Sequence, residues 1–221
     1  MPQNAHGVAA VLLAGGGGSR LGGGKLLLPC QGRPLIARVV DAVAQTPELL
    51  SLTVVLGHDA DAVRAEVERR MPELPMPVQF TLNAGWREGL STSLRCGLAG
   101  ALAAPGGQTA GGVLFLLGDQ PLVTARTLAA LVRAHGEARA RNSNHPATAP
   151  TYHGLRGNPV ILSPCLFPAL MALRGDTGGR RILRELGKRL LLVPVDDPGV
   201  LHDVDTPEAY EALCARPGNS Q

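Results

Sequence analysis

The sequence predicts an α/β protein with a three-layer, doubly wound fold and a mostly parallel sheet. Short aliphatic segments with strand character alternate with segments of helical periodicity along the whole chain. Polar or glycine-rich turns directly follow several of the aliphatic segments, as they do where parallel strands end. Of the 221 residues, 45% are hydrophobic and only 3% aromatic, which favours an aliphatic core. We therefore expect one domain over residues 1–215 and a disordered tail over residues 216–221.

Four segments in the first half have the length and composition of buried parallel strands: Val8–Leu13, Ser51–Leu56, Val78–Leu82 and Val113–Leu117. Helical patterns follow them at Leu35–Ala44, Asp59–Arg70, Ser91–Ala103 and Thr124–Arg139. The second half adds strands at Ala147–Tyr152, Val160–Leu162, Leu190–Val195 and Leu201–Val204, and helices at Cys165–Leu173 and Gly179–Leu186. Thr206 and Pro207 begin a final helix, and Asp59 and Thr124 are expected to cap theirs.

Composition and patterning exclude several classes of protein. The net charge of +3 and the scarcity of aromatic side chains argue against binding to nucleic acid. The first apolar run has no basic segment before it, and no segment approaches the roughly 18 continuous apolar residues of a membrane span. We therefore expect a cytoplasmic protein without membrane association. The four cysteines stand far apart and include no C-x-x-C pair, which predicts reduced, mostly buried thiols.

A glycine-rich loop from Ala14 to Lys25 follows the first strand. Glycine adopts φ > 0 without steric penalty, so the N–H groups of this loop can surround a bulky anion, and Arg20 and Lys25 add positive charge. The loop fits neither the P-loop motif G-x-x-x-x-G-K-[ST] nor the dinucleotide fingerprint G-x-G-x-x-G. We interpret it as a phosphate-binding loop. The alternative is a flexible linker, which seldom lies between a strand and a helix so early in a domain.

Two acidic sites follow other predicted strands. Asp119 comes directly after Val113–Leu117, where a carboxylate points into the crevice in which Mg²⁺ and phosphates bind. The plain alternative is an aspartate in an ordinary turn. Asp203 and Asp205 share the face of the last strand that lies opposite Val204. We expect Asp119 and Asp203 to hold Mg²⁺, with Asp205 as the alternative to Asp203.

Two further segments carry side chains suited to ligands. Asn83–Leu94 joins a strand to a helix, and its small polar side chains suit a nucleotide base or ribose; capping of the helix by Ser91 is the plain alternative. Six basic residues gather around Gly175–Arg180: Arg174, Arg180, Arg181, Arg184, Lys188 and Arg189. They form either a solvated helix face or a recognition site for an anionic second substrate, with Arg180 contacting a phosphate.

The loop Leu13–Lys25 resembles the signature L-A-[AG]-G-x-[GS]-S-R-[LM]-G-x-x-K of the nucleotidyltransferases, and in particular of the molybdenum cofactor nucleotidyltransferase family. The segments 83–94, 118–121, 157–160, 175–180 and 203–208 are similar to further motifs of that family, in the same order. The resemblance covers nearly the whole chain and implies a Rossmann-like nucleotidyltransferase fold.

The resemblance also implies roles for individual residues. It assigns catalysis to Arg20, Lys25 and Asp119, and acceptor binding to Asn158, Asp176 and Arg180. It assigns nucleotide binding to Leu13, Ala14, Gly15, Gly16, Gly17, Lys25, Asn83, Gly89, Ser91 and Asp119.

The implied reaction transfers CMP from CTP to the terminal phosphate of molybdopterin carrying molybdenum and releases pyrophosphate, with a molybdoenzyme as a candidate recipient. An acceptor phosphate with a second pKa of about 6 is mostly ionised at neutral pH, so no general base is required. The G-D-Q-P motif and the segment 83–94 favour CTP, whereas L-A-G-G favours GTP. The alternatives are guanylyl transfer to the same acceptor, a cytidylyltransferase of isoprenoid-precursor synthesis, and a non-catalytic carrier of the cofactor.

Overall fold

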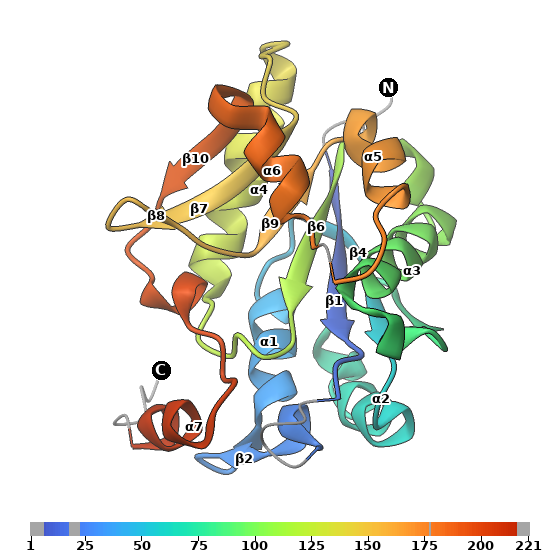
Figure 1. Cartoon of the computed structure of the whole chain (residues 1–221), viewed down its shortest axis with the longest axis vertical. Helices are drawn as coiled ribbons and strands as arrows, with labels where there is room; N and C mark the ends of the chain where they lie inside the picture. The colour runs from blue at the N-terminus through green and yellow to red at the C-terminus, as the bar shows by residue number, and fades with distance from the viewer. Residues whose placement is uncertain (1–6, 18–22, 177, 216–221) are drawn as a thin grey trace.

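The computed structural model describes residues 7–17, 23–176 and 178–215. Its main sheet has the strand order β10-β7-β9-β6-β1-β4-β5, and β8 pairs with β7 outside this path (Figure 1). The strands of this sheet are β1 (Val8–Ala14), β4 (Leu49–Leu56), β5 (Val78–Leu82), β6 (Gly112–Leu117), β7 (Ala147–Tyr152), β8 (Leu155–Arg156), β9 (Val160–Leu162) and β10 (Leu190–Pro194). Only β8 and β9 run antiparallel to their neighbours, so the predicted mostly parallel sheet is confirmed.

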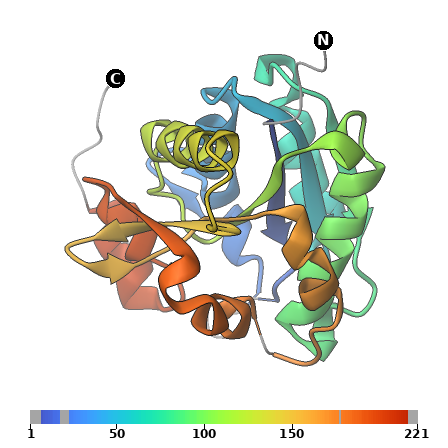
Figure 2. The ribbon, with the colours of Figure 1, turned by 90° about the horizontal axis from the view of Figure 1, so that it is seen from above.

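Helices cover both faces of the sheet. Their bounds are α1 (Leu35–Ala44), α2 (Ala60–Glu68), α3 (Leu90–Ala103), α4 (Ala125–Ala140), α5 (Phe167–Met171), α6 (Arg180–Leu186) and α7 (Pro207–Cys214). Helices α1, α2 and α4 lie on one face of the sheet, and α3, α5 and α6 lie on the other (Figure 2). Apolar side chains of the two groups of helices belong to two separate core clusters. Successive residues of β1 point to opposite faces, so Leu12 belongs to the first core cluster and Leu13 to the second. The three-layer fold class is confirmed.

The C-terminal helix α7 packs against a small hairpin made by β2 (Pro29–Cys30) and β3 (Arg33–Pro34). Leu213 of α7 and Val204 share a buried apolar cluster with Cys30, and the Tyr210 hydroxyl donates a hydrogen bond to the Pro29 carbonyl. Among the four cysteines, which are all free, Cys30 alone is buried and Cys165 is exposed. The prediction of mostly buried thiols is therefore wrong, because the second-half cysteines lie on surface helices.

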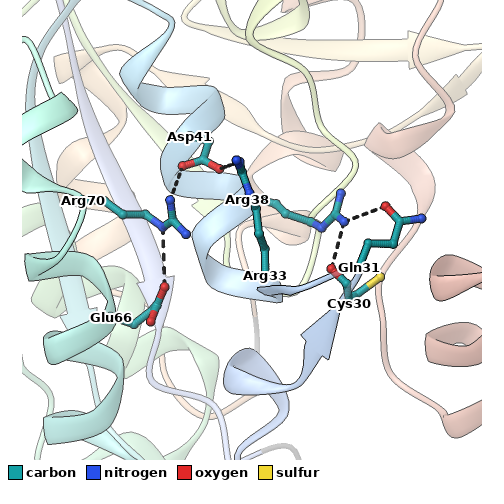
Figure 3. Close-up of polar contacts among 7 residues, drawn as sticks. All are labelled: Cys30, Gln31, Arg33, Arg38, Asp41, Glu66 and Arg70. Atoms are coloured by element: carbon teal, nitrogen blue, oxygen red, sulfur yellow. Dashed lines mark hydrogen bonds and ion pairs between the residues drawn. The ribbon is translucent and has the colours of Figure 1, made fainter. Parts of the chain in front are cut away.

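An ion-pair network connects β3, α1 and α2 (Figure 3). The Asp41 carboxylate accepts hydrogen bonds from Arg33 at 2.9 Å and Arg70 at 3.0 Å. Glu66, whose side chain is 5% exposed, pairs with Arg70 and with Arg69. These contacts join α2 to α1, whose apolar side chains belong to the first core cluster.

The predicted strand at Leu201–Val204 is wrong. Asp197 accepts a hydrogen bond from Gly199 N at 2.9 Å, and Pro198 lacks an N–H, so Pro198–Leu201 forms a 3₁₀ turn. The residues after it are extended but pair with no strand. The predictions that Thr124 and Thr206 cap their helices are confirmed, because their side chains accept hydrogen bonds from Thr127 N and Ala209 N respectively. None of the described helices is long and apolar enough to cross a bilayer.

Candidate functional site

The site lies where the sheet reverses its strand order. β1 is flanked by β4 on one side and by β6 on the other, and it is parallel to both. The carboxyl ends of β1 and β6 therefore lie side by side, with Leu13 opposite Leu117 and Gly118 N donating to Leu13 O at 3.0 Å. A crevice at such a reversal is the usual ligand site of an open α/β sheet. The glycine loop leaves β1 here, and Asp119 follows β6.

Lys25 is the centre of the polar groups in this crevice. Its Nζ lies 2.7 Å from Asp119 Oδ2 and 2.8 Å from Asp205 Oδ1, although the three residues are far apart in the chain. Burial lowers the pKa of Lys25, but the attraction of the two carboxylates outweighs it, so the pKa lies above its usual value. Lys25 is therefore a fixed cation at neutral pH. The structure thus brings together the predicted pair Lys25 and Asp119.

Asp203 lies in the same cluster but makes a different contact. Its Oδ1 accepts a hydrogen bond from Gln120 Nε2 at 2.6 Å, while Val204 N donates to Asp119 O at 2.9 Å. Burial and the nearby charge of Asp119 raise the pKa of Asp203, although Gln120 partly opposes the rise. Because the carboxylates of Asp119 and Asp203 repel each other, a cation between them would stabilise both.

The donor set at Asp119 and Asp203 suits a hard divalent ion. Mg²⁺ is commonly held by one or two carboxylates, with waters and substrate phosphates completing an octahedron. Within the described ranges, no group of three or more His, Cys, Asp or Glu side chains is placed to hold a metal ion by itself. The two carboxylates therefore fit a cation whose remaining ligands come from the substrate.

A cavity of about 440 Å³ opens above Lys25. Many predicted residues line it, namely Leu13, Gly15, Gly16, Gly17, Lys25, Gly89 and Asp119. Ala14 does not line the cavity, because its side chain is buried in the first core cluster. Arg20 lies outside the described residues. Ser93, Trp86 and Arg87 also line the cavity, and the sequence reasoning did not assign them a role there.

Asn83 and Ser91 lie beside this cavity and do not line it. Asn83 is 6% exposed, and its amide donates to Thr92 Oγ1 at 2.8 Å and Ser93 Oγ at 3.0 Å. These bonds hold the start of α3 against β5. Ser91 is fully buried. Gly89 occupies the N-cap position of α3 and no side chain caps the helix, so the alternative that Ser91 caps it is wrong. Ser93 lies three residues after Leu90 and therefore on the same face of the helix, and Leu90 lines the cavity. This spacing could have indicated that Ser93, and not Ser91, reaches the cavity.

A second cavity of about 420 Å³ adjoins the first and shares Leu13, Leu90, Leu117 and Asp176 with it. Its wall is largely aliphatic, with Phe115, Val160, Leu170 and Leu183 among its members. The three predicted acceptor residues Asn158, Asp176 and Arg180 all line it. Of the six clustered basic residues, Arg180 alone does so.

Arg156 of β8 lines the second cavity together with Arg180. Burial and the adjacent positive charge of Arg180 lower the pKa of Arg156. No ion pair to an acidic side chain is found for either arginine within the described part of the chain. Two neighbouring guanidinium groups of this kind favour an anion between them.

Gly89 lines the first cavity beside Leu90, which both cavities share. Its φ of +110° suits glycine, and a Cβ there would lie 2.5 Å from Gly175 C and 2.6 Å from Asp176 Oδ1. The loop that carries Asp176 therefore packs directly on the start of α3, and Ser91 N donates to Gly175 O at 3.2 Å. This close packing places Asp176 at the boundary of both cavities.

A glycine-rich loop, a buried lysine and neighbouring carboxylates meet at the reversal point of a doubly wound sheet, and these are the features expected of a nucleotidyltransferase. The model of the MobA-like NTP transferase domain family matches residues 10–198, and the chain belongs to this family. Nicotine blue oxidoreductase of Paenarthrobacter nicotinovorans is 32% identical over 210 residues, covering 93% of this chain and 96% of that protein.

Solved structures share the fold over nearly the whole chain. The crystal structure of Rv0371c from Mycobacterium tuberculosis is 28% identical, with a TM-score of 0.72, and covers 94% of this chain and 97% of that one. A structure of the same protein in complex with manganese has a TM-score of 0.71 at 27% identity, covering 96% of this chain and 100% of that one.

Proposed function

We propose that this protein transfers CMP from CTP to the terminal phosphate of a molybdopterin-type acceptor in a Mg²⁺-dependent reaction that releases pyrophosphate. The observation that carries the proposal is the contact of 2.7 Å between Lys25 and Asp119 in a glycine-lined cavity that adjoins a second, arginine-bearing cavity. The first cavity would hold the nucleotide and the second the acceptor.

The nucleotide's triphosphate binds to the loop after β1. Gly15, Gly16 and Gly17 line the cavity and leave room for the phosphates, and Lys25 supplies a permanent positive charge. Lys25 contacts Asp119 and Asp205 on one side, so its position is fixed before substrate arrives. A preorganised cation stabilises charge that develops on the phosphates without reorganising at the moment of reaction. Arg20 is proposed to add a second charge from the same loop.

Asp119 and Asp203 would hold the Mg²⁺ ion. When bound, the ion supplies positive charge to the phosphate oxygens of the nucleotide. Gln120 holds Asp203 in place through the bond of 2.6 Å, and the Val204–Asp119 backbone bond keeps the two carboxylates adjacent. Asp205 remains with Lys25 and serves to hold the lysine rather than the metal.

The acceptor would occupy the second cavity. Its aliphatic wall fits an uncharged ring system, while Arg156, Arg180 and Asn158 provide donors for anionic groups. An oxygen of the acceptor phosphate attacks the α-phosphorus of CTP, the bond from that phosphorus to the bridging oxygen breaks, and pyrophosphate leaves with the electron pair. Because the attacking phosphate is already ionised at neutral pH, the site needs no general base. Asp176, between the cavities, would orient the acceptor.

The choice of CTP rests on the G-D-Q-P motif and the segment 83–94, and GTP remains the alternative. A cytoplasmic setting with a molybdoenzyme as recipient follows from the same proposal. A cytidylyltransferase of isoprenoid-precursor synthesis and a non-catalytic carrier remain the other readings. The name of the full-length relative also makes an oxidoreductase a second candidate, favoured by 32% identity over 93% of this chain.

Pyrophosphate release tests the proposal. Purified protein with Mg²⁺ and molybdopterin should release pyrophosphate from CTP faster than from GTP, and none without acceptor. The isoprenoid-precursor acceptor and NADPH serve as comparison substrates. Oxidation of NADPH by an added electron acceptor, without pyrophosphate release, would replace the proposal with a redox function. Absence of both activities would favour a carrier.

A further inference from the structure

The end of β4 contacts both described ends of the glycine loop. His58 N donates to Gly15 O at 3.2 Å, and a Cβ on Gly57 would lie 2.5 Å from the same oxygen. At the other end, Gly24 N donates to Asp59 Oδ2 at 3.0 Å. Two consecutive residues thus bind the loop where it leaves β1 and where it reaches Lys25.

The side chain of His58 lies between these two contacts. Its Nδ1 is 2.6 Å from Asp59 Oδ2, the same oxygen that accepts from Gly24 N. A Cβ atom added at Gly17 or at Gly23 would lie within 3.7 Å of a carbon atom of the His58 ring, so the ring is close to both glycines. Trp86 meets the ring edge to face, with 5.2 Å between centroids, and also contacts Gly17. The imidazole therefore packs between the two ends of the loop.

Asp59 has an unusual backbone conformation. It begins α2 with a left-handed φ of +55°, and its carboxylate caps none of the helix N–H groups. The predicted role of Asp59 as a side-chain cap is therefore wrong, although it occupies the N-cap position. An aspartate in this region carries backbone strain that glycine would relieve. The carboxylate instead goes to Gly24 and His58, so the strained position serves the loop rather than the helix.

We propose that His58 and Asp59 are positioning residues for the nucleoside triphosphate, which hold the two ends of the glycine loop at the separation that the triphosphate requires and fix the backbone beside Lys25. This inference rests on the proposed function of the loop. Asp59 acts through Gly24, the residue before Lys25, and His58 orients Asp59 and supports Gly17 and Gly23. Trp86 closes the other side of the ring.

Substitution of Asp59 separates this role from a purely structural one. Asp59→Gly removes the carboxylate and also relieves the strained φ, so the protein should unfold at an unchanged or higher temperature. Its dissociation constant for Mg²⁺-bound CTP should nevertheless rise about tenfold, as expected for the loss of a charge-assisted hydrogen bond. In turnover, KM for CTP should rise with kcat within about twofold of wild type, because the loop contacts the triphosphate before and during reaction.

Matched variants complete the test. Asp59→Asn keeps an acceptor for Gly24 N and tolerates the left-handed conformation, so it should restore most of the affinity. Asp61→Ala removes an exposed acid from the first turn of the same helix and should leave affinity unchanged. His58→Ala should weaken CTP binding in the same direction by a smaller factor, whereas His145→Ala, in the loop between α4 and β7, should not.

Calorimetric titration of each variant with CTP and with GTP in Mg²⁺ gives the decisive numbers. An Asp59→Gly protein that binds the preferred nucleotide as tightly as wild type overturns the inference and leaves the proposed function standing. A wild-type protein that binds neither nucleotide overturns the proposed function, and the inference with it.

Discussion

Acid should destabilise this protein through one buried histidine. His135 of α4 is fully buried, with its Nδ1 2.9 Å from Thr148 Oγ1 and its Nε2 3.4 Å from Gly111 O. Burial lowers the pKa of His135 from 6.5 to about 4, and the Gly111 carbonyl opposes the shift only in part. The folded protein therefore keeps this imidazole neutral at pH values where the unfolded chain protonates it.

The sign and size of the effect follow from this difference. The folded pKa lies below the unfolded one, so the contribution is fully present above pH 6.5 and is lost as the pH falls toward 4. At about 1.4 kcal/mol per pKa unit, the loss across this window is about 3 kcal/mol. For a domain of this size, that corresponds to a fall of roughly 10 °C in the unfolding midpoint.

Urea unfolding of wild type and His135→Gln between pH 7.5 and pH 4 measures the contribution. Glutamine retains a donor and an acceptor but does not titrate, so carboxylates and other groups contribute equally to both curves. The difference between the two free energies of unfolding should change by about 3 kcal/mol across the window, in favour of the variant at low pH. Parallel curves would show that His135 is protonated in the folded state as easily as in the unfolded one, and would refute the reasoning.

Three further predictions concern the site and its support. Asp119→Asn should lower pyrophosphate release at least about 100-fold without lowering the unfolding midpoint, because it removes a charge from the metal and Lys25; near-normal rates would refute the metal assignment. Gly89→Ala should reduce stability by about 2 kcal/mol and also weaken acceptor use, since its Cβ would displace Gly175 and Asp176; unchanged KM for the acceptor would contradict the shared boundary. Glu66→Ala should cost about 2–3 kcal/mol in urea unfolding because it removes the buried carboxylate that pairs with Arg69 and Arg70 and leaves Arg70 with Asp41 alone. Glu68→Ala, at an exposed pair, should cost less than about 1 kcal/mol, and equal losses would contradict the network in Figure 3.

Much of the fold could be predicted because local pattern and tertiary environment agree. The strands β1 and β6 are continuous aliphatic runs, as they must be when both faces of the sheet are covered. The prediction failed at Leu201–Val204, because Leu201 ends a 3₁₀ turn and the residues after it join none of the described strands. The pairs β2–β3 and β8–β7 were missed because two-residue strands carry too little pattern to detect.

The site was predicted unevenly for a related reason. Motifs that directly follow a strand, such as the glycine loop and Asp119, have their position set by the strand itself. Asp203 and Asp205 are two residues apart and equivalent in pattern, and only the packing of the chain places Asp205 on Lys25 and Asp203 on Gln120. Arg156 was missed because a single arginine in a turn has no distinguishing local signal.

The amino-acid order by itself thus determined the alternation of strands and helices, the glycine-rich loop after β1 and the acidic position after β6. These depend on neighbours within a few residues, for which side-chain period and backbone freedom suffice. The tertiary structure alone decided which carboxylate meets Lys25 and that Asp59 contacts the glycine loop. The Gly24–Asp59 and Lys25–Asp205 contacts join residues 35 and 180 positions apart, and their geometry exists only once the sheet has brought its strand ends together.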